Sequence, residues 1–279
     1  MVDFLLVIPA YNESERLPSY LEALAKELES EKYSVRILVV DDGSKQHERE
    51  ALVRAVQLLA NRYPFISPPM LPPVNQGKGG AIMTGWSSDC SAKWLSFADA
   101  DGATPAREVA RLFRIAAARE PRNSCFFASR IRLLGRAVER KTARHLMGRV
   151  YATLVGCFIH PGIYDSQCGF KIISADTYRS IQDVLSEKRF AFDVELLAAL
   201  IDAGARIEEV PIDWRDIPGS KVSFVRDTVR MFVSLLRIRA RRKRWNIVKA
   251  TEIFARVPRT SVHDSGDSGA CCREEISAL

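Results

Sequence analysis

Two aspartates separated by one residue are the side chains of this sequence best suited to bind a metal. They are Asp99 and Asp101, in the stretch FADADGATP at residues 97–105. In an extended segment alternate side chains project to the same side, so the two carboxylates can share one divalent cation. Oxygen ligands with open coordination positions suit Mg²⁺ or Mn²⁺ bridging a diphosphate. An isolated Asp-X-Asp is more often a solvated turn, but this one ends the apolar run WLSFA, in line with Asp41 and Asp42 at the end of an earlier run.

The elements that position these acids are short β-rich runs alternating with helical patterns, which is typical of an α/β fold with a mainly parallel sheet flanked by helices. The predicted strands cover residues 4–10, 35–42, 94–101 and 124–130. The predicted helices include one with Leu17, Leu21, Leu24 and Leu28 on one face, and two more near residues 79–88 and 105–120. Ligands collect beyond the carboxyl ends of such strands, so these ends should line one cleft. Residues 64–73, with five prolines, should form an extended connection.

Charge and cysteine content narrow the function classes. The 279 residues carry a formal net charge of +7, which favours an anionic partner: nucleic acid, a phosphorylated small molecule or an anionic membrane surface. The six cysteines have neither the density nor the spacing of a disulfide framework or a zinc site, and we expect reduced thiols in a cytosol-facing protein. The apolar run after Met1 is too short for a signal peptide or a membrane span.

Phosphate-binding glycine loops are not found where a nucleotide fold of the common kinds would need them. PAYNE, at residues 9–13, matches neither a dinucleotide fingerprint nor a P-loop, and in NQGKGGA, at 75–81, Lys78 is followed by glycine. The glycines of this second segment permit either a close approach of the backbone to a ligand at a helix start or a turn that needs positive φ. The segment alone does not favour one of these.

Eight motifs taken together resemble a known family. In chain order they are VIPAYNE, VVDDGS, NQGKGGA, FADADGAT, ASR, DSQCGFK, FAFDVELL and DWRDIPGSK. Their order and spacing are similar to those of family 2 glycosyltransferases with the GT-A fold, and more narrowly to dolichyl-phosphate β-glucosyltransferases and mannose synthases. The resemblance covers residues 3–240 and implies a nucleotide-sugar donor, Mg²⁺ or Mn²⁺, and a polyprenyl or dolichyl phosphate acceptor. Asp-Gly-Ala-Thr after the Asp-X-Asp resembles the glucosyl branch and favours UDP-glucose over GDP-mannose.

The resemblance also implies roles for single residues. The nucleoside would lie against Pro9, Tyr11, Glu13 and Asp41, with Asp42 and Lys78 beside them. The metal would be held by Asp99 and Asp101. The acceptor phosphate or the donor diphosphate would be held by Arg130, Arg140, Arg144 and Lys221. The loop that shapes the sugar pocket would contain Asp165, Gln167 and Lys171, whereas Glu195 is matched without a defined role. Of these we expect Asp101, Arg130, Arg140 and Asp165 to act in catalysis.

Such a reaction needs no general base. The four histidines, His47, His145, His160 and His263, lie outside all eight motifs. A lipid phosphate is already an anion near neutral pH because its second pKa is about 6. Arginines can neutralise the incoming phosphate while a metal takes up charge on the departing diphosphate. Direct in-line attack on an α-linked donor would invert the anomeric centre and give a β-linked product.

The basic segments have simpler interpretations too. The run at 130–149 can be a solvated basic face, an interpretation that fits Arg132, Arg136 and Arg149 better than Arg130 at a strand end. Cys168 is better explained as a packed thiol than as a nucleophile. Within a basic amphipathic segment at 222–256, residues 222–240 place Val225, Val229, Phe232 and Leu236 on one helical face and Arg226, Arg230 and Arg237 on another. This pattern fits a helix in the membrane interface and equally a final helix packed on the sheet.

We therefore expect a catalytic domain at 1–221, the basic segment and a disordered tail at 257–279, in a cytoplasmic protein peripheral to the cytosolic face of a membrane. Three alternatives fit less well. A sugar nucleotidyltransferase would normally have a glycine-rich basic loop where this chain has AYNESER. A nucleic-acid-binding protein would explain the charge but not the acid pairs, and no recognition motif of that kind is visible, so we expect no nucleic-acid partner. A processive polysaccharide synthase would contain a Gln-x-x-Arg-Trp motif and membrane spans, and this sequence shows neither.

Overall fold

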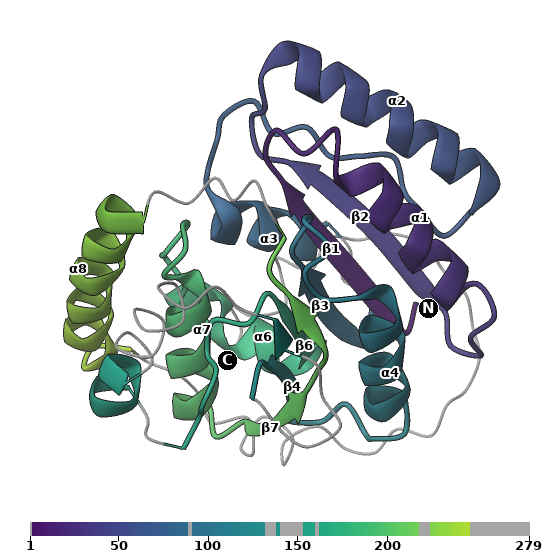
Figure 1. The fold of residues 1–279 in the computed structure, drawn as a ribbon. Helices are drawn as coiled ribbons and strands as arrows, with labels where there is room; N and C mark the ends of the chain where they lie inside the picture. Colours follow the sequence, from purple (N-terminus) through teal and green to yellow (C-terminus); the bar gives the residue numbers. More distant parts are fainter. Residues whose placement is uncertain are drawn as a thin grey trace, which may run out of the picture.

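The fold is built on a six-stranded sheet with strand order β2-β1-β3-β6-β4-β7 (Figure 1). The structure, a computed structural model, describes residues 2–88, 91–131, 138–139, 153–159, 162–217 and 224–245. The strands of this sheet are β1 (Phe4–Ala10), β2 (Val35–Asp41), β3 (Trp94–Ala98), β4 (Ser124–Ser129), β6 (Phe170–Ser174) and β7 (Arg206–Pro211). A two-stranded parallel pair is formed by β5 (Val138–Glu139) and β8 (Trp214–Arg215).

Strand directions bring many chain segments to one edge of the sheet. β1 is parallel to β2 and β3, and β7 is parallel to β4, whereas β6 runs antiparallel between β3 and β4. The carboxyl ends of five strands and the amino end of β6 therefore meet at the same edge. The predicted mainly parallel α/β sheet is confirmed, and the four predicted strands are present. The antiparallel β6 and the edge strand β7 were not predicted.

Helices cover both faces of the sheet (Figure 1). One face packs against α1 (Leu17–Leu28), α2 (Gln46–Arg62) and α4 (Ala106–Ala117). The other face packs against α3 (Lys78–Trp86), α6 (Ala175–Ile181) and α7 (Phe192–Asp202), with a short 3₁₀ helix at Gln182–Val184 after α6. The last described helix, α8 (Phe224–Arg242), contacts α7 and lies at the left of Figure 1.

Two hydrophobic cores follow from the alternation of side chains along buried strands. In β1, Phe4, Leu6 and Ile8 enter the core beneath α1 and α4, while Leu5 and Val7 enter the core beneath α3 and α7. The four leucines predicted to share one face of α1 are all buried, so that prediction is confirmed. The proline-rich stretch is extended along β2 through isolated bridges from Ile66 to Ile37 and from Met70 to Val40, as expected.

Several predicted features fall outside the described residues. They are Arg132, Arg136, Arg140, Arg144, Arg149, Lys221 and the tail 257–279. The bounds of the predicted domains therefore stay predictions. Among the helices that the structure describes, none combines the length and the apolarity that crossing a bilayer requires.

Candidate active site

The predicted metal-binding aspartates lie in a turn at the end of β3. Because β3 ends at Ala98, the expectation that the strand continues to Asp101 is wrong. Asp99 leaves the strand with its N–H donating to the carbonyl of Gly169, 2.9 Å away, and Asp101 accepts a hydrogen bond from the N–H of Ala103 at 3.0 Å. Gly102, at φ +74°, supplies the positive φ that the turn needs. The two carboxylates are therefore neighbours through a turn and not through strand alternation.

Asp101 is held in an environment that disfavours its charge. Burial raises its pKa, and the adjacent Asp99 carboxylate raises it further. Burial, and after it the charges of Asp101 and Asp99, also raise the pKa of the hydroxyl of Tyr20, whose ring lies beside Gly102 of the turn. Two close carboxylates of which one resists ionisation form a site where a divalent cation would relieve the repulsion.

A chain of alternating charges runs from Asp99 into the core. Lys78 Nζ lies 2.9 Å from Asp99 Oδ1 and 3.1 Å from Asp193 Oδ2, and Lys171 Nζ lies 2.5 Å from Asp193 Oδ1. Lys171 also donates to the carbonyl of Cys168 at 2.8 Å. Both ammonium groups lie about 5 Å from the ring of Phe97, at 4.9 and 5.2 Å. Burial works against ionisation of Asp193, but the two lysines together lower its pKa.

Arg130, directly after β4, is oriented by Asp165. Its Nε and NH2 donate to the two oxygens of that carboxylate at 2.7 and 2.8 Å, and its backbone N–H donates to the same group at 2.9 Å. Asp165 is fixed in turn by its own N–H, which donates to Glu209 on β7 at 2.8 Å, and the guanidinium carbon lies 5.3 Å from the centre of the Trp214 ring. This bidentate pairing gives the guanidinium one orientation.

Arg130 and the acid pair belong to one site. Although burial disfavours the charged guanidinium, Asp165 and, more weakly, Asp99 raise the pKa of Arg130. One short segment contacts both groups, because Asp165 pairs with the Arg130 guanidinium and the carbonyl of Gly169 accepts from the Asp99 N–H. Cation and acids therefore share one edge of the sheet, as the strand directions require.

The predicted nucleoside side contains a buried acceptor with no partner. Asp41, fully buried at the end of β2, accepts from Arg49 Nε at 2.8 Å and from the Ser44 N–H at 3.3 Å through Oδ2. In the described part of the chain its Oδ1 has no hydrogen-bond partner. Glu13 is bound to Arg16 at 2.5 Å. Such an unpaired acceptor is costly in a folded protein, and a donor group from a ligand would satisfy it.

The other predicted nucleoside residues follow β1 and open α3. Pro9 lies within β1, and Tyr11, just beyond it, is exposed. Lys78 begins α3 and reaches the acid pair as described above.

The glycines at the start of α3, Gly77 and Gly79, lie close to residues 187–192. Asp42, expected beside the nucleoside, accepts from the N–H groups of Gln76 and Gly77 at 2.6 and 2.7 Å, so both its oxygens hold this segment. A Cβ on Gly77 would lie 2.6 Å from the Lys188 carbonyl oxygen, and one on Gly79 would lie 2.5 Å from Phe192 Cβ. The helix start and the positive φ of Gly77, +89°, are as predicted. The space beside these glycines is filled by protein atoms, so close packing also accounts for them, and the approach of a ligand to this helix start stays a prediction.

Residues of the motifs DSQCGFK and FAFDVELL fall into two groups, those that lie near the site and those that are buried beneath it. Gln167, whose N–H donates to Asp165 Oδ1 at 3.3 Å, lies in the loop before β6. Lys171 lies in β6 and is 0% exposed, so the expectation that it belongs to the loop that shapes the sugar pocket is wrong. Its ammonium forms the buried ion pair with Asp193. Burial raises the pKa of the Cys168 thiol to about 12, in agreement with a packed thiol. Glu195 is also buried, and it accepts from the N–H groups of Ser186 and Glu187.

Comparison with known proteins decides the family. A sequence model described as "Glycosyl transferase family 2" matches residues 5–181. The chain belongs to this family. Similar curated proteins include the dolichyl-phosphate beta-glucosyltransferase of Dictyostelium discoideum, 32% identical over 246 residues that cover 85% of this chain and 73% of that protein. The human protein of the same name is 32% identical over 246 residues, 85% of this chain and 74% of that one.

Solved structures share the GT-A fold at low identity. Glucosyl-3-phosphoglycerate synthase from Mycobacterium tuberculosis, in complex with Mn²⁺, uridine diphosphate and phosphoglyceric acid, superposes with a TM-score of 0.64 at 14% identity over 85% of this chain and 78% of that one. Mannosyl-3-phosphoglycerate synthase from Rubrobacter xylanophilus gives a TM-score of 0.63 at 16% identity over 87% and 74%. At this identity the likeness shows the fold.

The acid pair of this family 2 glycosyltransferase fits a cation that is bound by the protein and a substrate together. Among the described residues no group of three or more His, Cys, Asp or Glu side chains is arranged to hold a metal. If a divalent cation binds, two carboxylates, one of them with a raised pKa, could supply part of its oxygen ligands. A Cβ on Gly169 would lie 2.0 Å from Asp99 Oδ2, so the Asp99 carboxylate lies directly against this glycine.

Sequence reasoning missed three supporting residues. Asp193 carries the link between Lys78 and Lys171, although Glu195 was the acid singled out in FAFDVELL. Trp214, from DWRDIPGSK, lies against the Arg130 guanidinium, and Glu209 fixes the loop that contains Asp165. The first two stand in motifs that the resemblance quoted. Glu209 lies outside them, and its contact across strands has no local signal.

Proposed function

We propose that the chain transfers glucose from UDP-glucose to the phosphate of a dolichyl or other polyprenyl phosphate and gives a β-linked lipid-phosphate sugar. The observation that carries the proposal is the position of the Asp99–Asp101 pair and the oriented Arg130 at one edge of the sheet, where the segment 165–169 contacts both Asp99 and Arg130. Curated relatives about 32% identical are named for this glucosyl transfer, and this supports the choice of donor and acceptor.

On the donor side, Asp99 and Asp101 would hold Mg²⁺ or Mn²⁺. When bound, the cation would take up negative charge on the departing diphosphate. The buried Oδ1 of Asp41 would accept a hydrogen bond from the base or ribose, next to Pro9, Tyr11 and Glu13. Lys78 would stay attached to Asp193 and add positive charge beside the diphosphate.

On the acceptor side, Arg130 would neutralise the lipid phosphate so that two anions can approach each other. Asp165 and Trp214 keep its guanidinium in place. A phosphate oxygen of the acceptor would attack the anomeric carbon, the bond from that carbon to the diphosphate would break, and UDP would leave with its electron pair. The attacking phosphate is already ionised near neutral pH, so no histidine is required. Arg140, Arg144 and Lys221 stay predicted helpers of this step.

A lipid acceptor also places the reaction at a membrane. We infer a protein peripheral to a membrane, with its donor site open to the cytosol where sugar nucleotides are found. The basic composition, +7 overall, favours an anionic lipid surface.

The test is transfer from radiolabelled UDP-glucose, GDP-mannose and UDP-N-acetylglucosamine to a short, water-soluble polyprenyl phosphate, with and without Mn²⁺. We expect a β-glucosyl product from UDP-glucose that depends on the metal. Asp101→Ala should abolish turnover, and Arg130→Ala should lower it about a hundredfold, mainly through a higher KM for the acceptor.

Matched controls are Asp176→Ala and Arg206→Ala, which remove one exposed acid and one exposed base far from the site edge. Both should keep wild-type turnover. Preference for GDP-mannose would assign the protein to the mannosyl branch. Full turnover in Asp101→Ala would remove the metal assignment.

A further inference from the structure

Within residues 230–242, helix α8 packs against the protein through one face, and at its edge the Arg239 guanidinium carbon lies 4.8 Å from the centre of the Phe158 ring. Leu235 and Ile238 are 0% exposed and belong to the core beneath α7. The end of the helix is held by ion pairs: Arg241 lies 2.7 Å from Glu195 Oε1, and Arg242 lies 2.6 Å from Asp202 Oδ1. These contacts fix the rotation of the helix about its axis, and therefore determine which residues point outward.

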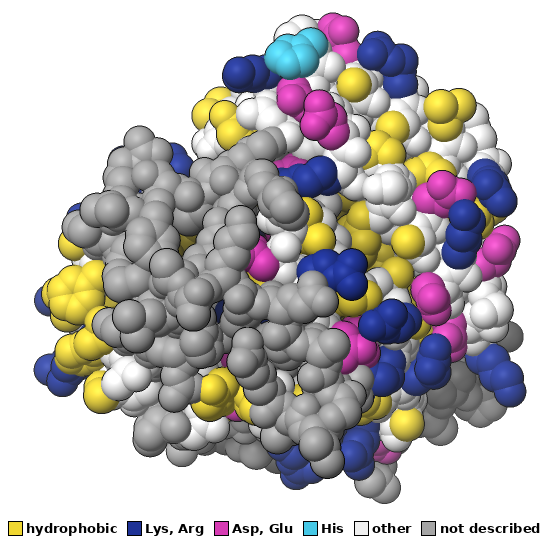
Figure 2. All heavy atoms as spheres, in the orientation of Figure 1, with side chains coloured by type: hydrophobic (Ala, Val, Ile, Leu, Met, Phe, Trp, Pro, Cys, Tyr) yellow, Lys and Arg dark blue, Asp and Glu magenta, His cyan; other side chains and the backbone are white. Residues whose placement is uncertain are grey.

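The outward face carries an apolar stripe. Phe232 and Val233 are each 39% exposed and Leu236 is 43% exposed, with the exposed Ala240 one turn further along. At about 100° per residue these four side chains span the centre of the free face. In Figure 2 hydrophobic side chains gather at the left edge, over α8, with Lys and Arg side chains around them.

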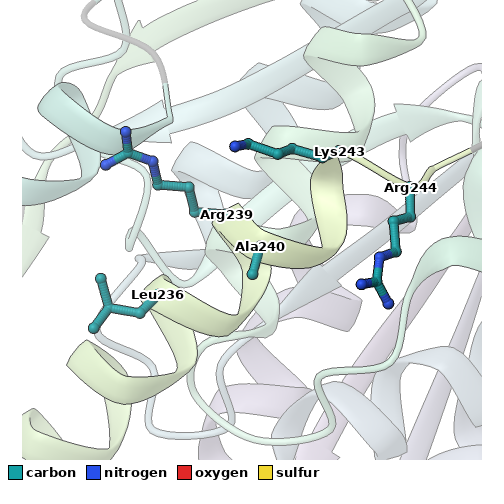
Figure 3. A pocket seen from close by; sticks show the side chains of 5 residues that line it. All are labelled: Leu236, Arg239, Ala240, Lys243 and Arg244. Carbon is teal, nitrogen blue, oxygen red and sulfur yellow. The ribbon is translucent and has the colours of Figure 1, made fainter.

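Basic side chains border the stripe on both sides. By the same helical geometry Arg239 lies on one side, and Arg230 and Arg237 lie on the other. Lys243 and Arg244 follow directly after the end of the helix and are exposed. Leu236, Arg239, Ala240, Lys243 and Arg244 line a shallow, open hollow of about 460 Å³. Figure 3 shows Arg239 and Lys243 extending from one side of the helix and Arg244 from another. Residues 228–245 contain no Asp or Glu.

We propose that this face of α8 docks the protein on a bilayer that contains anionic lipids. Phe232, Val233 and Leu236 enter the boundary between headgroups and acyl chains, while the bordering arginines and lysines contact lipid phosphates. The inference deepens the proposed function and rests on it for its purpose, because it keeps the site near a lipid acceptor. The physical claim about α8 stands on the contacts above.

The charge pattern favours a bilayer over a second copy of the chain. Two copies that met through this face would bring ten cations together around a small apolar contact, since each face carries Arg230, Arg237, Arg239, Lys243 and Arg244. Like charges placed close together oppose association. An anionic bilayer instead neutralises both borders of the stripe at once.

The experiment is flotation of the purified full chain with vesicles of phosphatidylcholine alone and of phosphatidylcholine with about 30% phosphatidylserine, chosen to give appreciable surface charge. One variant combines Arg237→Gln, Lys243→Gln and Arg244→Gln; another combines Phe232→Ser, Val233→Ser and Leu236→Ser. The matched control combines Arg54→Gln and Leu58→Ser on α2, where Leu58 is 71% exposed on another helix.

We expect wild type and control to bind the anionic vesicles, more weakly at high salt, and to bind neutral vesicles poorly. Each basic residue near the surface contributes about fivefold, so the charge variant should lose about a hundredfold in partitioning. The apolar variant should lose about tenfold or more. UDP affinity and the thermal midpoint, measured for every variant, should stay at wild-type values.

Equal binding by wild type and both α8 variants would overturn the proposal, as would binding that excess inorganic phosphate abolishes at constant ionic strength. A dimer in light scattering that only the α8 variants disrupt would assign the face to a second copy.

Turnover of the water-soluble acceptor without vesicles is measured in parallel. Its absence in wild type would contradict the proposed function while the flotation result still decides the role of α8.

Discussion

Lys78 Nζ lies 2.9 Å from Asp99 Oδ1, so a predicted metal ligand is paired with a lysine whose other partner is a buried aspartate. Lys78 is 14% exposed, whereas Asp193 and Lys171 beneath it are 3% and 0% exposed. Two cations and two anions alternate from the surface to the core. This series of ion pairs fixes the position of Asp99 relative to β3 and β6, the two strands that border it.

The first prediction concerns Lys171→Met. The substitution leaves Asp193 buried with one cation in place of two and removes the hydrogen bond to the Cys168 carbonyl. Loss of one partner from a buried ion pair should lower the free energy of unfolding by about 3 kcal/mol, measured by urea unfolding at pH 7. Lys93→Met is the control, because Lys93 pairs with Asp3 at the surface and should contribute less than about 1 kcal/mol.

The stability that Asp193 contributes should also depend on pH. Its lysine partners lower its pKa below the ordinary 3.8, so the ionised group stabilises the folded state above that pH. The contribution is lost as pH falls through the lowered value. The difference between wild type and Lys171→Met should therefore be constant from about pH 5 to pH 7 and shrink below pH 3.8. A difference that grows on acidification would contradict this assignment.

The next prediction concerns Gly169→Ala. The new Cβ would lie 2.0 Å from Asp99 Oδ2, so the carboxylate must move while the backbone keeps an ordinary conformation. Displacement of a positioned group by about 1 Å can lower turnover about a hundredfold. We expect that loss together with weaker Mn²⁺ binding, measured by electron paramagnetic resonance in the presence of UDP.

Gly204→Ala is the contrasting control. At φ +72° it should lose about 1 kcal/mol of stability, but with no atom within 4 Å of its Cβ it should keep full turnover. Unchanged Mn²⁺ affinity in Gly169→Ala would show that Asp99 does not ligate the metal.

What the sequence could predict depended on whether the signal was local. The positions of Asp41, Asp99 and Arg130 near the carboxyl ends of strands were predictable, since apolar runs followed by charged residues mark the ends of buried strands, although β3 ends three residues earlier than predicted. Asp193 and Lys171 were not recognised as a pair, because 22 residues separate them and only the antiparallel β6 brings them together. The role of Asp42 depended on contacts with Gln76 and Gly77, and the roles of Gly77 and Gly79 depended on contacts with residues 187–192, which no local pattern indicates.

Helix α8 shows the same limit in another form. Amphipathicity predicted an apolar face that includes Phe232 and Leu236, but not which face would meet the protein. The structure buries Leu235 and Ile238 and leaves Phe232 and Leu236 exposed. The buried face packs into the core beside α7 and its end is held by ion pairs with Glu195 and Asp202, contacts whose positions no local pattern contains.

A further prediction concerns Arg130→Lys, which keeps the charge and loses the planar fork. Lysine cannot make the two parallel bonds to Asp165 and has no planar group to place beside the Trp214 ring, so its ammonium would be poorly positioned for a phosphate. We expect kcat/KM for the acceptor to fall about a hundredfold while UDP affinity, measured by calorimetry, stays unchanged. Arg107→Lys, at an exposed ion pair with Asp213, should match wild type. A fall in UDP affinity instead would place Arg130 on the donor side.

The final prediction is that Asp101→Asn stabilises the metal-free protein and removes its response to Mn²⁺. Burial and Asp99 raise the pKa of Asp101, so the folded state favours its neutral form; that stability is present below the ordinary value of 3.8 and is lost as pH rises through the folded pKa. Asparagine stays neutral at every pH and keeps the oxygen that accepts from Ala103. At pH 7 with a chelator the variant should therefore unfold at a higher temperature than wild type, and this difference in unfolding temperature should disappear near pH 3.8.

Adding Mn²⁺ with UDP should raise the thermal midpoint of wild type but not of the variant. If both proteins respond equally to Mn²⁺, Asp101 is no ligand; if the variant is less stable without metal, repulsion between Asp99 and Asp101 is not what the metal relieves.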